Sequence, residues 1–440
     1  MHDFHYRHDA LHCEDLPLER LDKEQGTPCY IYSHATLIRH FQAFDQAFAA
    51  IPHLVAFAIK ANSNLAILRL MASQGSGADI VSGGELFRAL RAGIPPDKIV
   101  FAGVGKHHQE IREALEAGIL FFNVESSAEL QTLNDVARAM GTQARVALRI
   151  NPDIDPDTHP YIATGLKKSK FGIGADHAVE TFHHAASLPG IRVVGVHAHI
   201  GSQLTHLSPF VESLQKVVVL IETLHAQGLP VQYLNIGGGL GITYSNETPP
   251  HPRAFAEAIL PLLRQTRCEI ILEPGRVIVG NAGILLTRVL YTKETGTKKF
   301  VIVDAAMNDL LRPSLYDAHH DIVPVRRMSH ASEEVVDVVG PVCESGDFFA
   351  RNRAMPPVKA GDLLAVMSAG AYGFTMASNY NSRPRVPEIL VKGGDSCVIR
   401  ARETFDDLIR GECIPDFLET PVTPHPAFLL HPSFPLGRDV

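Results

Sequence analysis

The 440-residue sequence lacks the features that define several classes of protein. No segment approaches the roughly 18 uninterrupted apolar residues that a membrane-spanning helix needs. Residues 1–18 alternate charged residues and histidine without an apolar core, so we do not expect a secretory signal. Cysteine is scarce and forms no C-x-x-C pair, which argues against a disulfide scaffold or a zinc site and favours reduced thiols in a cytoplasm. The six cysteines are Cys13, Cys29, Cys268, Cys343, Cys397 and Cys413.

An excess of positive charge is also missing. Forty Lys and Arg residues stand against 48 Asp and Glu residues, giving a formal net charge of −8, which argues against nucleic acid or an anionic membrane as a partner. The 23 histidines contain no H-E-x-x-H motif, and no metal site is predicted. Hydrophobic residues make up 45% of the chain and charged residues 20%, typical of a packed soluble enzyme. The length suits two domains.

Short apolar runs alternate with amphipathic stretches over the first two thirds of the chain. Strict alternation of strand and helix indicates parallel strands joined by crossover helices, and eight such strands close a barrel. An open doubly wound sheet is the alternative, but it rarely continues for eight repeats without a topological break. We therefore predict a (β/α)8 TIM barrel over residues 34–276. Its eight strands are expected at residues 54–59, 78–81, 99–102, 120–124, 145–150, 193–200, 233–236 and 269–272.

The pattern changes after residue 276. Runs such as Val335-Val336-Asp337-Val338-Val339 are rich in β-branched residues and separated by turns, which predicts an all-β C-terminal domain, a barrel or sandwich, over residues 277–420. The lead-in, residues 1–33, is expected to pack on this β domain. The proline-containing tail, residues 421–440, is expected to extend over the surface.

The unusual residues fall where barrel strands end, which is where barrels gather their chemistry. Lys60 ends the first strand in the sequence Phe57-Ala58-Ile59-Lys60-Ala61-Asn62. Partial burial disfavours the ammonium form and makes a free amine available to a carbonyl, such as that of pyridoxal phosphate. Taken alone, a lysine that closes a strand and reaches solvent is the more common case.

Further strand ends supply groups that suit the same cofactor. After the seventh strand, Gly237-Gly238-Gly239 lets the backbone approach an anion, although Ile242 occupies the third glycine position of a dinucleotide fingerprint. Ser202 adds a hydroxyl donor, and His199 could stack on a cofactor or be a core histidine. Glu273, in the eighth-strand motif Glu273-Pro274-Gly275-Arg276, could protonate the pyridine nitrogen or pair with Arg276. Together these groups indicate a pyridoxal phosphate site.

Three motifs of the second domain place reactive or charged residues among small turn residues. These are Leu311-Arg312-Pro313-Ser314-Leu315-Tyr316, Cys343-Glu344-Ser345-Gly346-Asp347 and Gly370-Ala371-Tyr372-Gly373. Cys343 beside two carboxylates suits a proton donor more than a nucleophile, while an inert buried thiol is the more common case.

In combination these motifs resemble the diaminopimelate decarboxylase family. This family belongs to the fold type III pyridoxal-phosphate enzymes, which also include ornithine decarboxylase and alanine racemase. The resemblance runs from Gly26-Thr27-Pro28 to about Ser378. It depends on the combination of the motifs F-A-I-K-A-N, H-I-G-S, G-G-G, E-P-G-R, C-E-S-G-D and A-Y-G. The stretch from Thr158 through Gly165 to Lys170-Phe171-Gly172 resembles the diaminopimelate branch in particular. Phe57 departs from the pattern, in which tyrosine is usual.

The resemblance implies roles for these residues. Lys60 would bind the cofactor covalently, and His199 would stack on its ring. The phosphate and ring nitrogen would be held by Ser202, Gly237, Gly238, Gly239, Glu273, Gly275 and Arg276. Substrate would be bound by Arg276, Arg312, Tyr316, Glu344 and Tyr372, the last of which also touches the cofactor. Cys343 would return a proton to the α-carbon. The family is dimeric, with Cys343 and Glu344 reaching into the partner's barrel.

The expected activity is the decarboxylation of meso-2,6-diaminopimelate to L-lysine and carbon dioxide, the last step of lysine biosynthesis. A related decarboxylase acting on ornithine, arginine, a D-amino acid or carboxynorspermidine is the main alternative, although two arginines suit a substrate with a second carboxylate. A racemase typically uses tyrosine opposite lysine, so Cys343 argues against it. A non-catalytic pyridoxal phosphate carrier would lack the second domain.

Overall fold

The computed structural model describes residues 2–154, 170–327 and 332–418. It divides the chain into two compact units. The first unit comprises residues 34–283 together with residues 368–375. The second contains residues 3–33, 284–367 and the chain from residue 376 onward. Residues 368–375 thus return to the first unit after the chain has entered the second, which the sequence analysis does not predict.

Eight parallel strands of the first unit pair in a closed ring, which confirms the predicted barrel. Each strand pairs with the next, and β13 pairs with β5 to complete the ring. The strands in pairing order are β5 (His53–Ala58), β6 (Gly77–Ile80), β7 (Ile99–Phe101), β8 (Phe121–Val124), β9 (Ala144–Asn151), β11 (Ile191–His197), β12 (Tyr233–Asn235) and β13 (Glu269–Leu272). The two-residue strand β10 (Ile173–Gly174) adds to β9.

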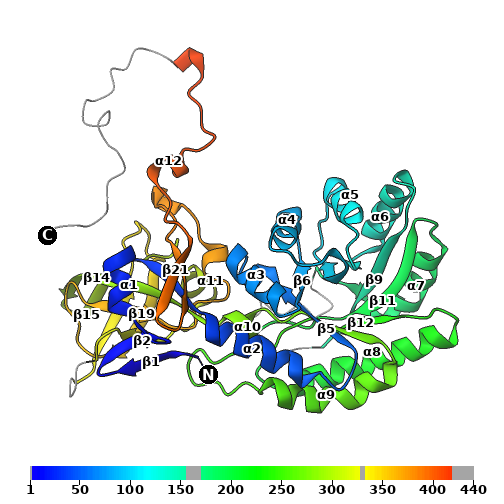
Figure 1. Ribbon diagram of the computed structural model, residues 1–440, viewed down its shortest axis with the longest axis horizontal. Coiled ribbons are helices and arrows are strands. Elements are labelled where there is room, and N and C mark those ends of the chain that lie inside the picture. Colours follow the sequence, from blue (N-terminus) through cyan, green and yellow to red (C-terminus); the bar gives the residue numbers. More distant parts are fainter. Residues whose placement is uncertain (1, 155–169, 328–331, 419–440) are drawn as a thin grey trace. The chain divides into compact units, whose positions relative to one another are not determined.

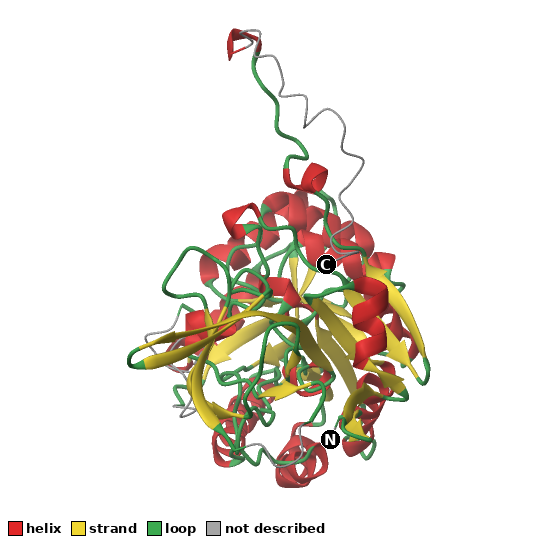
Figure 2. Ribbon diagram, turned by 90° about the vertical axis from the view of Figure 1, so that its left-hand side faces the viewer, coloured by secondary structure: helices red, strands yellow, loops and turns green. Residues whose placement is uncertain are grey.

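Helices lie outside these strands, as Figures 1 and 2 show. They are α2 (His34–Ala47), α3 (Leu65–Ser73), α4 (Gly83–Arg91), α5 (His108–Ala117), α6 (Ser127–Ala139), α7 (Ala178–Ser187), α8 (Ser208–Ala226), α9 (Pro252–Thr266) and α10 (Arg276–Val279). Among the described helices none is long and apolar enough to cross a membrane.

Local sequence fixes where the helices start, and therefore how each strand end is shaped. Asn64, Ser82 and Ser126 each accept a hydrogen bond from a backbone N–H in the first turn of the following helix. These N-caps satisfy donors that the helix itself leaves unpaired. Each cap stands only a few residues after a barrel strand, so the strand-to-helix connection is short and the strand end is held in place.

The second unit is rich in sheet, which confirms the predicted β-rich C-terminal domain, and its described part also contains short helices. Its large sheet is mixed, because β15 and β17 pair in parallel, as do β4 and β20. In order along the sheet its strands are β18 (Phe348–Met355), β17 (Glu334–Val339), β15 (Lys298–Val303), β14 (Gly283–Thr295), β4 (Cys29–Ser33), β20 (Glu388–Lys392) and β21 (Asp395–Arg400), with β19 (Leu363–Val366) on β14 and β16 (Ile322–Pro324) on β19. The described helices of this unit are α1 (Leu18–Gln25), α11 (Arg312–Tyr316) and α12 (Phe405–Leu408).

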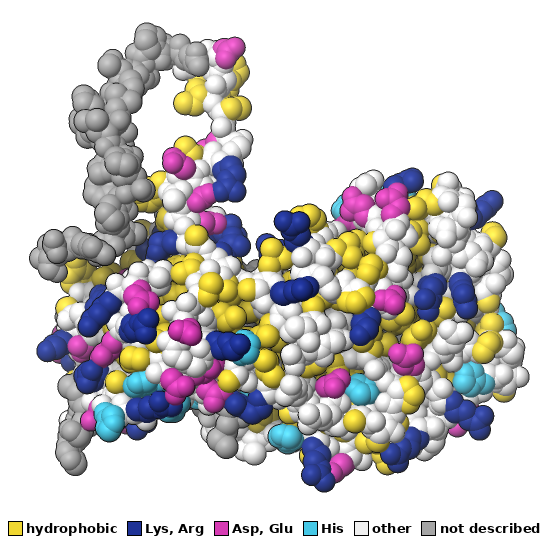
Figure 3. All heavy atoms as spheres, in the orientation of Figure 1, with side chains coloured by type: hydrophobic (Ala, Val, Ile, Leu, Met, Phe, Trp, Pro, Cys, Tyr) yellow, Lys and Arg dark blue, Asp and Glu magenta, His cyan; other side chains and the backbone are white. Residues whose placement is uncertain are grey.

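The lead-in contributes to the core of the second unit. It forms a small antiparallel sheet from β1 (Phe4–Arg7), β2 (Ala10–Cys13) and β3 (Leu16–Pro17). Leu11 and Leu18 share a buried cluster with Ile284 of β14 and Ile389 of β20. All six cysteines are free thiols. On the face drawn in Figure 3, basic and acidic side chains are interspersed.

Gly370 offers a test of the return of residues 368–375 to the first unit. A Cβ at this position would lie 2.0 Å from the carbonyl oxygen of Val279 and 2.9 Å from the amide nitrogen of Gly283. We expect Gly370→Ala to force backbone apart at a cost of roughly 1–3 kcal/mol, which lowers the thermal denaturation midpoint by several degrees. Gly105→Ala is the control, because nothing lies within 4 Å of its Cβ position. Equal midpoints for the two variants would contradict the close packing.

Candidate active site

Lys60 lies at the carboxyl end of the barrel, in the 3-10 turn η1 (Ile59–Ala61) that follows β5. Its ammonium pairs with the carboxylate of Asp79. The pair forms because Ala58 and Asp79 are register partners in the parallel strands β5 and β6. Asp79 is fully buried, whereas 38% of the Lys60 side chain remains exposed. The barrel therefore presents one amine with its counter-ion fixed in the sheet.

The expectation that burial keeps Lys60 as a free amine is wrong. Burial does act to lower the pKa of Lys60, but the carboxylate of Asp79, with Tyr372 and Glu273, raises that pKa above its ordinary value. Lys60 is an ammonium at neutral pH, so its reaction with a carbonyl requires that a proton be passed on. Asp79 is adjacent, and its Oδ1 has no hydrogen-bond partner among the described residues.

Glu273 follows β13 and points its carboxylate into the barrel end. Its Oε1 accepts hydrogen bonds from Nδ2 of Asn235 at 2.6 Å and from Nδ2 of Asn123 at 3.2 Å. Burial, and then the negative charge of Asp79, raises the pKa of Glu273 to about 8. Two amide donors, rather than the nearby guanidinium of Arg276, thus hold this carboxylate.

The glycines after β12 are required by close backbone packing. Gly237 and Gly239 have φ of +66° and +109°, where side chains are disfavoured. A Cβ on Gly237 would lie 2.6 Å from Nδ1 of His199, and one on Gly238 would lie 2.2 Å from the carbonyl oxygen of Glu273. Gly275 likewise packs against Ala61. The imidazole of His199 therefore packs against the glycine loop. Burial, and then the charge of Arg149, lowers the pKa of His199 well below its usual value.

Arg276 connects the glycine loop region to two aromatic side chains. Its guanidinium donates to the hydroxyl of Tyr244 at 2.5 Å and to Oγ of Ser202 at 3.0 Å. It also lies over the ring of Tyr372, 4.8 Å from the centroid. Tyr372 belongs to the returning segment, and its backbone N–H donates to the carbonyl of Ala61, next to Lys60.

One cavity of the first unit brings these residues together. Its lining includes all the candidate site residues of the predicted barrel, together with Tyr372, which the sequence placed in the second domain: Lys60, His199, Ser202, Gly237, Gly238, Gly239, Glu273, Gly275, Arg276 and Tyr372. An amine, a glycine cradle, a guanidinium with a hydroxyl, and a carboxylate fit a phosphorylated pyridine aldehyde. The site therefore has the donor set that pyridoxal phosphate needs.

The remaining selected residues lie in the second unit, where they form a group of their own. Arg312 and Tyr316 are four residues apart on α11, so they occupy one side of that helical turn. Ser314, between them, donates to the carbonyl of Gly346 in the loop that carries Cys343 and Glu344. Both Cys343 and Glu344 are exposed. The second unit thus gathers its four candidate residues on adjoining segments.

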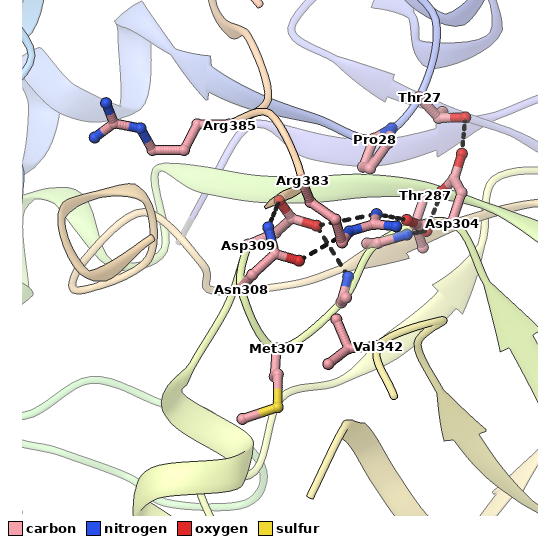
Figure 4. A network of polar contacts seen from close by, with 12 residues as sticks. Thr27, Pro28, Thr287, Asp304, Met307, Asn308, Asp309, Val342, Arg383 and Arg385 are labelled. Atoms are coloured by element: carbon pink, nitrogen blue, oxygen red, sulfur yellow. Dashed lines mark hydrogen bonds and ion pairs between the residues drawn. The ribbon is translucent and has the colours of Figure 1, made fainter. Parts of the chain in front are cut away.

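Residues 378–383, which carry none of the predicted site residues, hydrogen-bond to the Cys343–Glu344 loop and to the loop that precedes α11. Asn381 Oδ1 accepts from the backbone N–H of Cys343 at 3.0 Å, and the hydroxyl of Tyr380 donates to Glu344 at 2.6 Å. Figure 4 shows Arg383 beside the loop that precedes α11, where it donates to Asn308 at 3.0 Å and to the carbonyl of Asp304 at 2.6 Å. No sequence motif marks this segment, because its asparagines and serines are ordinary turn formers.

Comparison with known proteins identifies the family. Residues 34–280, more than half of the chain, match the family model "Pyridoxal-dependent decarboxylase, pyridoxal binding domain". The diaminopimelate decarboxylase of Vibrio cholerae is 51% identical over 408 residues, which cover 92% of this chain and 97% of the relative. That of Haemophilus influenzae is 49% identical over 409 residues, covering 93% and 98%. The chain belongs to the diaminopimelate decarboxylase family.

Solved structures of diaminopimelate decarboxylases agree with this assignment. The Helicobacter pylori protein, solved in complex with L-lysine, matches with a TM-score of 0.86 at 46% identity, covering 89% of this chain and 98% of that one. The diaminopimelate decarboxylase of M. jannaschii matches with a TM-score of 0.89 at 40% identity, covering 94% of this chain and 99% of that one. The barrel followed by a sheet-rich unit is therefore the fold of this family. Enzymes of the diaminopimelate decarboxylase family are carboxy-lyases that use pyridoxal phosphate.

The structure also shows where motif matching is incomplete. Within the branch-specific stretch, residues 158–165 lie outside the described residues. The ring of Phe171 lies under Arg149, with its centroid 4.8 Å from the guanidinium carbon.

Three residues that surround Glu273 are not among the predicted site residues: Asn123, Asn235 and His197. The available signal was a polar residue at or near the end of a short apolar strand, as in Phe121-Phe122-Asn123-Val124.

Asp79→Asn tests the control of the Lys60 proton. Because the pKa of Lys60 is raised, its ammonium loses its proton only above the pH range that is ordinary for lysine. Without the charge of Asp79, the ammonium should lose its proton at a lower pH. We expect the visible absorbance of lysine-bound cofactor, formed on adding pyridoxal phosphate to stripped protein, to develop at lower pH in Asp79→Asn than in wild type. Lys60→Ala should give no such band. The exposed change Asp97→Asn is the control, and an unchanged pH midpoint in Asp79→Asn would refute the assignment.

Proposed function

We propose that this protein decarboxylates meso-2,6-diaminopimelate to L-lysine and carbon dioxide with pyridoxal phosphate as cofactor. The observation that carries the proposal is the cavity in which Lys60, Glu273 and Arg276 meet. It occurs in a chain about half identical, over more than nine tenths of its length, to relatives named diaminopimelate decarboxylase. A neighbour named lysine/ornithine decarboxylase shares the fold at only 22% identity.

The residues of the first unit would bind and polarise the cofactor. When bound, pyridoxal phosphate supplies an electron-withdrawing ring that accepts the electron pair left behind by carbon dioxide. Lys60 would be the residue that holds it covalently. Glu273 would hold a proton at the ring nitrogen, and the neutral His199 would stack on the ring. The phosphate would be bound by Ser202, Arg276 and the N–H groups of Gly237–Gly239.

The residues of the second unit would recognise the substrate. Arg312 and Tyr316, with Arg276 and Tyr372, bind carboxylates, and a guanidinium suits a carboxylate because it donates two parallel hydrogen bonds. Glu344 takes the distal ammonium, and Cys343 delivers a proton to the α-carbon after carbon dioxide has left. The two arginines favour a substrate with a carboxylate at each end over ornithine or arginine. We further propose that the protein works in the cytoplasm as a homodimer, with Cys343 and Glu344 serving the partner's barrel.

Substrate choice is tested by carbon dioxide release with product identification. We expect release from meso-diaminopimelate with formation of L-lysine, and little from L-ornithine, L-arginine or D-lysine. Release from one of the other three would keep the cofactor chemistry and overturn the roles of Arg312, Tyr316 and Glu344. If none of the four released carbon dioxide, a non-catalytic cofactor carrier would be favoured instead.

The role of Cys343 is tested by Cys343→Ala. Because a positioned proton donor contributes about 10²-fold or more, the variant should retain cofactor absorbance while its turnover falls by roughly that factor. Cys397→Ala, which removes another exposed thiol of the same unit, is the matched control and should behave as wild type. An unchanged rate in Cys343→Ala would show that the thiol takes no part in the reaction.

A further inference from the structure

His197, two residues before His199, lies deep in the barrel with no role assigned above. It ends β11, where its register partners are Arg149 of β9 and Asn235 of β12. Because side chains alternate along a strand, His197 and His199 face the barrel interior, whereas Ala198 faces the helices and lines an apolar pocket with Phe210. Only 1% of the His197 side chain is exposed.

The ring of His197 has an incomplete set of polar contacts. Neither Nδ1 nor Nε2 has a hydrogen-bond partner among the described residues. A buried polar atom without a partner costs free energy, and a phenylalanine or leucine would fill the same space without that cost. Nε2 lies 3.6 Å from Oε2 of Glu273, slightly beyond hydrogen-bond distance. The histidine is therefore directed at the residue assigned to the cofactor ring.

The surroundings of Glu273 leave Oε2 as the oxygen that lacks a fixed donor. Asn235 and Asn123 both donate to Oε1. Burial, and then the charges of Arg149 and His199, lowers the pKa of His197 well below its usual value, so the imidazole is neutral and carries one N–H. A neutral ring can donate that N–H to a carboxylate without adding a charge that would compete with a protonated pyridine.

We propose that His197 is a positioning residue for Glu273: when pyridoxal phosphate is bound, it closes the 3.6 Å separation, donates its Nε2–H to Oε2 and so orients this carboxyl group toward the ring nitrogen. The inference rests on the proposed function, because it takes Glu273 as the partner of that nitrogen. His197 touches neither cofactor nor substrate in this scheme. Its effect on the cofactor passes entirely through Glu273.

The test is a double-mutant cycle on cofactor affinity. His197→Phe and Glu273→Gln are made singly and together, stripped of cofactor, and titrated with pyridoxal phosphate while the absorbance of lysine-bound cofactor is followed. His197→Phe should raise the Kd about tenfold, the typical effect of losing one hydrogen bond to a charged group. In the Glu273→Gln background the same change should have almost no effect, because the residue through which His197 acts is already altered. An equal loss in both backgrounds would mean that His197 only fills space, and would overturn the proposal.

Two conservative variants at position 197 distinguish a hydrogen-bonding role of His197 from a space-filling one. The side-chain amide of glutamine can occupy the place of Nε2, whereas that of asparagine is shorter and corresponds to Nδ1. We expect His197→Gln to restore most of the wild-type affinity and His197→Asn to resemble His197→Phe. If His197→Phe does not fold, the Gln and Asn variants replace it in the cycle. Equal affinities for these two variants would contradict the proposal.

The same experiment separates failure of this inference from failure of the proposed function. If Glu273→Gln alone leaves cofactor affinity and absorbance unchanged, Glu273 is not the partner of the ring nitrogen, and both the proposed role and this inference are wrong. If Glu273→Gln weakens binding while His197→Phe matches wild type, only the role of His197 is wrong.

Discussion

The buried ion pair between Lys60 and Asp79 imposes the main requirement on this barrel. Moving an ammonium and a carboxylate out of water costs several kcal/mol per ion unless both find partners. The barrel meets this requirement by alternating charges around its end. Lys106 pairs with Glu129 at 2.6 Å and Arg149 pairs with Glu125 at 2.7 Å, all four side chains being almost fully buried. Of these three pairs of described residues, only that of Lys60 has a side chain that lines the cavity.

Asn123 connects one of these pairs, Lys106 with Glu129, to Glu273. Its backbone carbonyl accepts from the ammonium of Lys106 at 2.9 Å, and its side-chain amide donates to Glu273. The position of Glu273 therefore depends on a strand, β8, that lies across the ring from β13. Each polar group in such a network restricts the orientation of its neighbours. The barrel end can therefore hold the side chain of Glu273, whose pKa is raised to about 8, in a fixed orientation.

The sequence predicted the barrel and the cavity lining well, for a physical reason. A parallel barrel places every strand's carboxyl end at one face, so residues that end the predicted strands must meet there. Lys60, Gly237–Gly239 and Glu273 were found on this basis. Their partners were not found, because Asn123, Asn235 and His197 contribute single polar atoms inside apolar strands, and no local pattern shows which distant carboxylate such an atom contacts.

The return of residues 368–375 to the barrel was invisible in sequence for a different reason. Backbone groups attach it: Ala369 N–H donates to Gly283, Gly370 N–H to Gly280, and Tyr372 N–H to Ala61. Since any residue type except proline can make such bonds, side-chain periodicity carries no record of them.

Contacts with the backbone also distinguish the two acids of the C-E-S-G-D motif. Asp347 is buried and accepts from the backbone N–H groups of Met307 and Val342, each at 2.7 Å, so it shapes the loop. Glu344 is exposed and is held by a side-chain hydroxyl, which leaves its second oxygen for a ligand. A motif match treats these acids alike, whereas their contacts distinguish a buried acid that shapes the loop from one that is exposed.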